Sequence, residues 1–410
     1  MNLRDNDLKN QIKTGVMNSI DFSKDISDEE MYELIDRQMY QATRNKALSV
    51  EDKKRLRTQL FHSIRKLDVL QQLVDDPKVT EIMINGTDNI FIEKNGAITK
   101  SDVTFESREK LEDVVQQIVA SCNRVVNESS PIVDARLSNG ARVNIVLNPI
   151  ALNGPIITIR RFPDEPITMK TLIEIGSISK ELRDYLEILI KAGYNIFICG
   201  GTGSGKTTFL NALSDFIPKD LRVISIEDNA ELQIRGVPNL VRMEARNANV
   251  EGCKAISIRD LIKSSLRMRP DWIIVGEVRG AECIDMLQAM NTGHMAMSTG
   301  HSNSASDMLS RIETMSLMGM DIPLPAIRGQ IASGIDVIVH LGRLRDRSRK
   351  VLEITELRKE IDPISGKISM NTLFKFEEKG IDQNGKIIGE WNRIGKLENT
   401  EKLLAAGLKL

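Results

Sequence analysis

Several features are scarce in this chain of 410 residues, and each scarcity argues against a class of protein. Its four cysteines, Cys122, Cys199, Cys253 and Cys283, form no Cys-x-x-Cys pair, so neither a zinc ribbon nor a disulfide framework is expected. Aromatic residues make up only 4%, which disfavours surfaces that stack nucleic-acid bases. The formal net charge is −1, so no global field would attract DNA or an anionic membrane.

Long apolar stretches are also missing. No run of 18 or more apolar residues occurs, so no segment is expected to span a membrane. The polar start, MNLRDNDLKNQIKTG, lacks the apolar core of a signal peptide. We therefore expect a cytoplasmic protein that works at a membrane only through partners. Its length allows two or three domains, and 41% hydrophobic with 28% charged residues is ordinary for a globular protein.

The first part of the chain reads as helix. Residues 1–65 are expected to form an N-terminal helical extension, of which 1–48 would be mobile or only weakly helical. Apolar residues at steps of three and four predict one helix over 49–76, which begins at a capping pattern on Ser49.

Strand and turn signals follow over 66–163, where Asn-Gly turns separate short β-type runs. They predict a small α+β domain. Two prolines shortly after it indicate a linker, which we assign to 164–176.

From 177 to 344, apolar strand candidates alternate with helical stretches, which predicts an α/β domain with a parallel sheet and helices on both faces. The strand candidates are 195–199, 222–226, 272–276, 294–299 and 336–341. Residues 345–410 carry shorter strand-like pieces and a terminal helix near 398–407, and we expect them to form an appendage.

The segment GGTGSGKT at 200–207 fits G-x-x-x-x-G-K-[ST], the pattern of a phosphate-binding loop (P-loop). It directly follows a strand candidate and opens a helical run, which is the context such a loop requires. Glycines let backbone N–H groups turn towards phosphates, and the helix N-terminus adds positive potential. Lys206 would contact the β- and γ-phosphates and Thr207 would ligate Mg²⁺. The residues expected at the nucleotide are Gly201, Thr202, Gly203, Ser204, Gly205, Lys206, Thr207 and Thr208.

Acidic side chains follow two other strand candidates, at the edge where ligands of open parallel sheets bind. A single acid at a strand end is usually a solvated loop residue. In combination with the P-loop, Glu277 is expected on the Mg²⁺ side and Glu227 is expected to polarise the attacking water. Asp271 opens a strand at the opposite edge, and we interpret it as structural.

Two of the four histidines, His294 and His301, each close a Thr-Gly-His triplet around one strand candidate. Seven residues apart on a strand, they face opposite sides of the sheet. His301 lies past the carboxyl end and is expected near the γ-phosphate. His294 begins the strand and is either core or a link to an adjoining subunit or domain.

Transfer of a phosphoryl group needs positive charge beyond Lys206. Arg160 and Arg161 end the last strand of the first domain, and strand alternation sends them to opposite faces, so one of them would face a nucleotide. Two solvated arginines on a surface strand are the alternative. Arg242 and Arg246 are further candidates, supplied to a neighbouring subunit.

The motifs, in their order along the chain, resemble those of the secretion ATPases of type II and type IV systems and of type IV pili. Beside the Walker A loop they are an Asp box, ISIEDNAEL (224–232), a Walker B segment, MRPDWIIVGEVRG (268–280), and a His box, TGHMAMSTGH (292–301). The resemblance covers roughly 66–395. It is greatest to the CpaF-type motor of tight-adherence pili, and the tetracysteine zinc insert of extension motors is missing.

This resemblance implies a RecA-like P-loop NTPase domain in a ring hexamer, with ATP and Mg²⁺ bound between the two domains of each subunit. Domain closure would drive work on an inner-membrane platform protein, without direct contact to nucleic acid. The implied catalytic residues are Lys206, Glu277 as the Walker B carboxylate, Glu227 as the Asp-box acid, His301 of the His box, and Arg160 as the nucleotide-contacting arginine.

Four alternatives stay open at this stage. A helicase-type nucleic-acid motor is kept open by the basic run GRLRDRSRK (342–350), although a solvated loop explains that run as well. A conjugation or type IV secretion hub ATPase would carry similar motifs. A metabolic kinase is disfavoured by the first domain, which has no P-loop. A non-hydrolysing scaffold is disfavoured by the intact set of Lys206, Thr207, Glu227 and Glu277.

Overall fold

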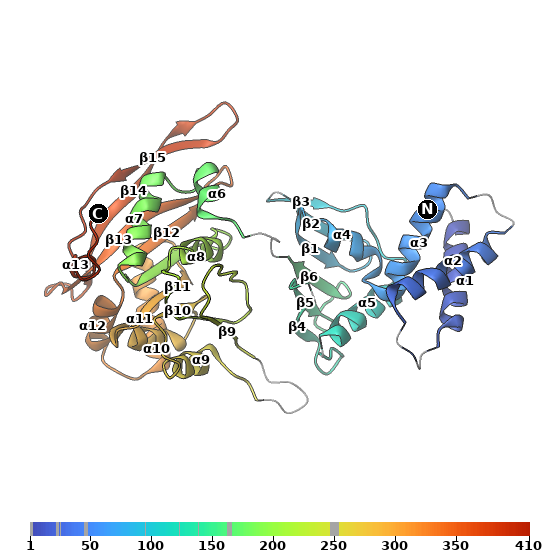
Figure 1. The fold of residues 1–410 in the computed structure, drawn as a ribbon, viewed down its shortest axis with the longest axis horizontal. Coiled ribbons are helices and arrows are strands. Elements are labelled where there is room, and N and C mark those ends of the chain that lie inside the picture. The colour runs from blue at the N-terminus through green and yellow to red at the C-terminus, as the bar shows by residue number, and fades with distance from the viewer. Residues whose placement is uncertain are drawn as a thin grey trace. The chain divides into compact units, whose positions relative to one another are not determined.

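The computed structural model describes residues 3–21, 24, 26–44, 48–94, 96–122, 124–137, 139–161, 166–246 and 254–410. The chain forms two compact units, Met1–Asp164 and Glu165–Leu410 (Figure 1). Within the described ranges, no helix is both long enough and apolar enough to cross a bilayer.

The first unit begins with three helices, α1 (Leu3–Ser19), α2 (Asp28–Ala42) and α3 (Val50–Arg65). We expected only a weakly helical extension up to residue 48, but α1 and α2 are regular helices that share a core with α3. The buried residues of α1 and of α2 recur at four-residue steps, which puts them on one face of each helix. The core residues are Leu8, Ile12, Val16, Met31, Ile35, Met39, Leu60 and Phe61.

The single helix expected over 49–76 is broken. Helix α3 ends at Arg65, and the chain continues as a 3-10 turn, η1 (Asp68–Leu70), and a short helix, α4 (Gln71–Asp75). Lys66 is extended and Asp68 has a φ of 49°, so the backbone leaves the helical region although the apolar spacing continues. Leu70, Leu73 and Val74 consequently join the core of the following sheet.

The small α+β domain contains one antiparallel sheet in the order β3-β2-β1-β6-β5-β4. Helix α5 (Arg108–Ser121) packs on it through Leu111, Val114 and Ile118. The edge strands β3 and β4 escaped the sequence analysis, because they are half exposed and lack a buried apolar run. The strands are β1 (Val79–Asn85), β2 (Ile90–Lys94), β3 (Ala97–Lys100), β4 (Ile132–Arg136), β5 (Arg142–Val146) and β6 (Ile156–Arg160).

The second unit is built on a nine-stranded sheet in the order β15-β14-β13-β12-β7-β11-β10-β8-β9. The six strands from β12 to β9 run parallel, as the sequence predicted. The edge strand β9 was missed. These six strands are β7 (Ile196–Gly200), β8 (Val223–Glu227), β9 (Leu240–Glu244), β10 (Trp272–Val275), β11 (Met295–His301) and β12 (Val337–Arg343).

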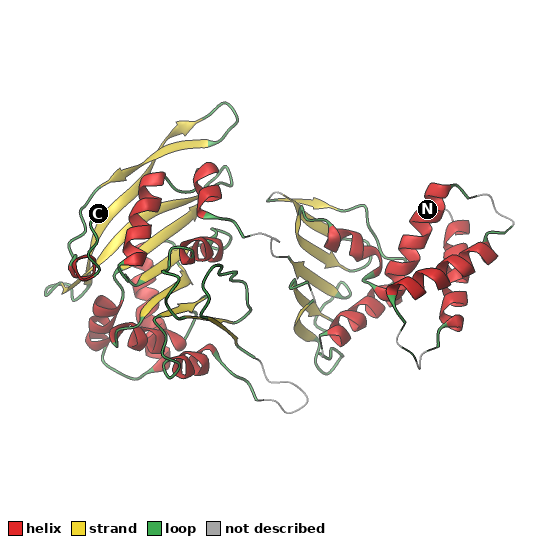
Figure 2. Cartoon of the chain, viewed as in Figure 1, coloured by secondary structure: helices red, strands yellow, loops and turns green. Residues whose placement is uncertain are grey.

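Helices cover both faces of this sheet (Figure 2). Alternate residues of β7 show the division, since Ile196 and Ile198 join one core while Phe197 and Cys199 join the other. The first face is covered by α6 (Met169–Glu174), α7 (Lys180–Lys191), α8 (Lys206–Ser214) and α13 (Glu401–Ala405). The second is covered by α9 (Ile258–Ser265), α10 (Glu282–Asn291), α11 (Ala305–Gly319) and α12 (Leu324–Gly334).

Residues 345–410, expected as an appendage, contribute three strands to this same sheet. They are β13 (Arg349–Ile361), β14 (Ile368–Ile381) and β15 (Ile387–Arg393), and each pairs antiparallel with its predecessor. Of the expected linker 164–176, residues 164–165 lie outside the described ranges and 169–174 form α6.

Candidate active site

The P-loop joins β7 to α8 at the carboxyl edge of the large sheet. Two of its glycines have a steric reason to be glycine. A Cβ on Gly200 would lie 2.3 Å from the carbonyl oxygen of Leu341 on the neighbouring strand β12, so no side chain fits there. Gly205 has a φ of 92° at the N-cap of α8, a left-handed conformation that L side chains rarely adopt. The predicted strand–loop–helix context is confirmed.

The start of α8 differs from that of most helices in the molecule. Seven described helices begin at a Ser or Thr whose hydroxyl accepts a hydrogen bond from the first turn: Ser27, Ser49, Ser107, Thr168, Ser179, Ser257 and Ser304. Helix α8 has Gly205 there and no side-chain cap. The buried Ser204 Oγ also has no hydrogen-bond partner among the described residues. Uncapped N–H groups with positive helix-end potential fit a phosphate.

Lys206 is the first residue of α8, and its side chain is folded into the loop. The residue is only 7% exposed, and its Nζ donates to the carbonyl oxygens of Gly200 at 3.0 Å and Gly201 at 3.1 Å. Burial lowers the pKa of this ammonium group, while nearby Glu277 acts in the opposite direction. The lysine is therefore a desolvated cation whose close contacts, among the residues that the structure describes, are two backbone oxygens and one histidine, and an incoming anion would replace them.

That histidine is His301, which pairs with Gly200 across β11 and β7. Its Nδ1 lies 3.2 Å from Lys206 Nζ, and its Nε2 lies 3.0 Å from Glu277 Oε1. Because an ammonium group only donates, Nδ1 accepts and the ring proton sits on Nε2, towards the carboxylate. The Nε2 contact is close but is not aligned as a hydrogen bond. Burial and the charge of Lys206 lower the pKa of His301, which favours the neutral form of the ring.

Glu277 lies two residues beyond the end of β10 and is held from its other side by an arginine. Arg279 Nη2 donates to Glu277 Oε2 at 2.6 Å, and Arg279 Nη1 lies 3.7 Å from Asp228 Oδ2 of the Asp box. A continuous row of contacts thus runs from Lys206 through His301, Glu277 and Arg279 to Asp228. It joins the four sequence motifs at one edge of the sheet.

Glu227 ends β8 and is buried, with 3% of its surface exposed. Burial raises its pKa to about 7, although the backbone N–H groups of Glu231 and Leu232 donate to Oε2 at 2.7 and 2.9 Å. It lies beside the Walker B segment, since a Cβ on Gly276 would come within 3.0 Å of Glu227 Cγ. A carboxyl group that titrates near pH 7 is suited to accept a proton from water.

The other predicted residues lie at different places. Thr207 and Thr208 are half-buried in the first turn of α8. Arg160 and Arg161 belong to the first unit, where Arg160 ends β6 with an exposed side chain and Arg161 donates to the carbonyl oxygen of Asp76. Their part in nucleotide binding stays a prediction.

The two histidines are separate, as expected. His294 lies at the amino edge of the sheet, where its Nδ1 is 3.3 Å from the carbonyl oxygen of Ala289. Asp271 lies at that edge too and accepts from the backbone N–H of Arg222 at 2.7 Å, which agrees with a structural role.

One contact to the P-loop was not anticipated. Arg349, from the basic run 342–350, donates from Nε to the carbonyl oxygen of Gly203 at 2.8 Å. The run was visible in the sequence, but its position depends on the pairing of β12 with β7, which no local pattern encodes.

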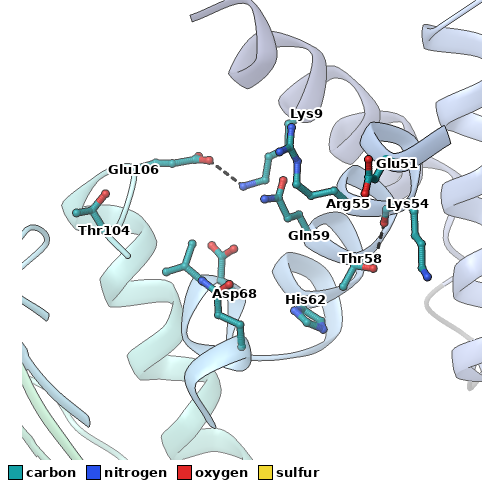
Figure 3. A pocket seen from close by; sticks show the side chains of 12 residues that line it. Lys9, Glu51, Lys54, Arg55, Thr58, Gln59, His62, Asp68, Thr104 and Glu106 are labelled. Carbon is teal, nitrogen blue, oxygen red and sulfur yellow. Dashed lines mark hydrogen bonds and ion pairs between the residues drawn. The ribbon is translucent and has the colours of Figure 1, made fainter. Parts of the chain in front are cut away.

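A cavity of about 670 Å³ lies within the first unit, whereas these motifs belong to the second (Figure 3). Side chains of α1, α3 and η1 and of the segment before α5 line it, and among them Lys9 and Glu106 form an ion pair at 2.8 Å. Its lining mixes cations such as Arg55 with carboxylates such as Asp68, so no single sign of charge favours one ligand class.

The P-loop and the parallel sheet with helices on both faces define the class of P-loop NTPase folds, and comparison with known proteins identifies the family. The model of the type II/IV secretion system protein family matches residues 64–386. The chain therefore belongs to the type II/IV secretion system ATPase family.

Individual relatives are similar over most of the chain. A putative conjugal transfer protein of Mycobacterium tuberculosis is 32% identical over 297 residues, which cover 71% of this chain and 84% of the relative. The probable conjugal transfer protein TrbB of Sinorhizobium fredii is 30% identical, over 72% of this chain and 90% of its own. The type IV secretion system protein PtlH of Bordetella pertussis is 29% identical, over 70% and 93%.

Solved structures share the fold. The pilus retraction motor PilT with bound ADP matches with a TM-score of 0.51 at 19% identity, covering 75% of this chain and 81% of PilT. The ATPase DotB of Yersinia pseudotuberculosis matches with a TM-score of 0.52 at 18% identity, covering 72% and 79%. These similarities confirm the α/β fold with a RecA-like ATPase domain and a smaller preceding domain.

Proposed function

We propose that this protein is an oligomeric, Mg²⁺-dependent ATPase motor that powers a pilus or secretion system. The observation that carries the proposal is the row of contacts from Lys206 through His301 to Glu277, beside a helix whose first turn has no side-chain cap. A cation, a neutral histidine and a carboxylate next to free N–H donors form a site suited to bind a phosphate chain and to activate water.

Each residue has a proposed role. Residues 201–208 bind the phosphates, with Lys206 on the β- and γ-phosphates. Thr207 and Glu277 would hold Mg²⁺, largely through water, as this ion prefers, and it would supply positive charge to the phosphates. Glu227 accepts the proton of the attacking water, and its burial and raised pKa support that role. His301 senses the γ-phosphate, since it already contacts both Lys206 and Glu277.

Arg160, with Arg161 as its neighbour, is proposed to add positive charge at the nucleotide. We also propose the division into an extension 1–65, an α+β domain 66–163, a linker 164–176, an ATPase domain 177–344 and a C-terminal part 345–410. Nucleotide-driven domain closure in a hexamer would then act on an inner-membrane platform protein, with the motor at the cytoplasmic face and no direct contact to nucleic acid. Membership of the secretion ATPase family supports this arrangement.

Two cellular processes are candidates for what the proposed motor powers. The motif resemblance described above favours a tight-adherence pilus of the CpaF type. The conjugal transfer relatives and PtlH favour a conjugation or type IV secretion hub instead. Deleting the gene in its host and scoring pilus formation, DNA transfer and protein secretion separates the two, because each candidate predicts loss of a different output.

The activity is tested by measuring ATP turnover against oligomer size for the parent and for Lys206→Ala. We expect Mg²⁺-dependent turnover that grows with assembly and falls by two orders of magnitude or more in the variant, because the γ-phosphate loses its buried cation (a loss of roughly 3 kcal/mol). Arg347→Gln removes one cation from an exposed turn and serves as the matched control. A monomer without turnover under any magnesium or nucleotide condition would contradict the proposal.

A further inference from the structure

The basic run 342–350 forms a hairpin, in which the end of β12 pairs with the start of β13. Its arginines have different environments. Arg345 makes a two-pronged ion pair with Glu378 on β14. Arg347 occupies the turn with a φ of 67°. Arg343 and Arg349 pair with each other across the two strands, so their side chains leave the hairpin on the same face.

The face of the hairpin that carries Arg343 and Arg349 lies beside the P-loop. Strand β12 lies next to β7, with Leu341 in register with Gly200, so the hairpin continues past the point where the P-loop begins. Arg349 Nε holds the carbonyl oxygen of Gly203 at 2.8 Å. A Cβ on Gly205 would lie 3.3 Å from Arg349 Cδ, and one on Gly203 would lie 3.7 Å from Arg343 Nη1. Both arginines therefore pass close over loop glycines.

The electrostatics of this pair are unfavourable in the absence of an anion. Like charges that face each other directly across two strands repel. Among the described residues neither Arg343 nor Arg349 takes part in an ion pair, whereas Arg345 on the same hairpin does. Two arginine side chains on one face of the hairpin, next to the uncapped N–H groups of a P-loop helix, suit the binding of phosphate oxygens.

We propose that Arg343 and Arg349 form a second cationic side of the nucleotide site, supplied by the same compact unit, Glu165–Leu410, that carries the P-loop. Arg343 binds the phosphate chain of a nucleoside di- or triphosphate directly. Arg349 is a positioning residue that fixes the P-loop backbone through Gly203. This inference rests on the proposed ATPase function, because it requires a nucleotide at the P-loop.

The test is the affinity for a fluorescent ADP analogue with Mg²⁺, measured on the full chain and on Arg343→Gln, Arg349→Gln and the control Arg347→Gln. We expect the first two to bind about tenfold more weakly than the parent, as for loss of a charged hydrogen bond at an exposed site, and the control to bind like the parent. Arg349→Lys should recover part of the loss, since it restores the charge without the Nε donor.

A second readout separates binding from mere packing. The melting temperature without nucleotide should stay at that of Arg347→Gln, while the rise in melting temperature caused by ADP should shrink in both Gln variants. The inference is overturned if both Gln variants bind ADP as tightly as the parent, or if their only change is a lower melting temperature without nucleotide. The ATPase proposal stands in either case. If the parent binds no ADP, both proposals fall. Loss of single-stranded DNA binding with normal ADP binding would assign the pair to nucleic acid and overturn the inference.

Discussion

The two edges of the large sheet are formed by the same strands but differ in their polar contacts. The carboxyl edge holds the candidate active site, and the amino edge holds a hydrogen-bonded network that stabilises the fold. At the carboxyl edge, Lys206 contacts its own loop and a neutral histidine, Ser204 Oγ has no partner among the described residues, and Glu227 has a raised pKa. At the amino edge, one network of buried polar groups is paired. Asn195 and Asp336 are the centre of that network.

The amino-edge network is nearly saturated. Asp336 Oδ2 accepts from the backbone N–H of Asn195 at 2.7 Å and from Lys402 Nζ at 2.6 Å. The Asn195 side chain donates to the carbonyl oxygen of Gly334 and accepts from the backbone N–H of Ala296. Lys402 ties α13 to the same point through the carbonyl oxygen of Gly193. Satisfied buried groups stabilise a fold, whereas an unpaired hydroxyl and a buried cation at the other edge are available to a ligand.

The largest expected difference between the two edges concerns strand β10. A loss of turnover from substitutions at both of its ends would contradict the comparison. Glu277→Gln removes the charge that we propose for Mg²⁺ and should reduce ATP turnover about a hundredfold or more, while ATP still binds. Asp271→Asn, at the opposite end of that strand, should leave turnover per folded molecule unchanged. Steady-state turnover and nucleotide binding measure both, and loss of binding in Glu277→Gln would show that its role is misassigned.

A second test of the comparison removes a buried carboxylate from the amino edge. Asp336 is only 4% exposed, and Asp336→Ala would remove the carboxylate that accepts from the N–H of Asn195 and pairs with Lys402. We expect the free energy of unfolding of the second unit to fall by roughly 2–3 kcal/mol, with turnover per folded molecule unchanged. Urea unfolding followed by turnover of the folded fraction checks this. A large loss of turnover at full stability would contradict the division between the edges.

The histidines sharpen the comparison, because one lies at each edge. His301→Ala removes the contact between Lys206 and Glu277 and should reduce turnover about tenfold. His294→Ala removes contacts to the carbonyl oxygen of Ala289 and the hydroxyl of Thr292, away from the P-loop, and should reduce turnover less than about twofold. Both variants are compared at equal folded concentration, and the reverse order would refute the assignment.

The smallest expected effect is a pH dependence at Glu227. Its pKa is raised from 4.5 to about 7 in the folded state, so the folded protein binds this proton more tightly than the unfolded chain. The stabilisation is therefore fully present below pH 4.5 and is lost as the pH rises towards 7. Glu227→Gln lacks this dependence. Urea midpoints of both proteins are measured at pH 5, 6, 7 and 8. The midpoint of the parent should fall relative to that of the variant as the pH rises, and parallel curves would contradict the raised pKa.

Much of this arrangement was predictable from the sequence. Parallel strands buried on both faces are continuous apolar runs, and residues just beyond them lie at one edge by topology alone. That is why Lys206, Glu277 and His301 were expected together and lie together. Edge strands such as β3, β4 and β9 were missed because half-exposed residues carry no such pattern. The break after Arg65 was missed because a positive φ at Asp68 leaves no trace in apolar spacing.

Local chemistry therefore determined the P-loop, the motif residues and the strand ends, since each depends on residues close in sequence or on one shared sheet edge. Tertiary structure decided the rest. Pairing of β12 with β7 brought Arg349 to the carbonyl of Gly203, 146 residues away in the chain. Packing buried Glu227 and raised its pKa, and it joined residues 345–410 to the central sheet. Long-range register and desolvation are properties of the folded chain, and no short stretch of sequence encodes them.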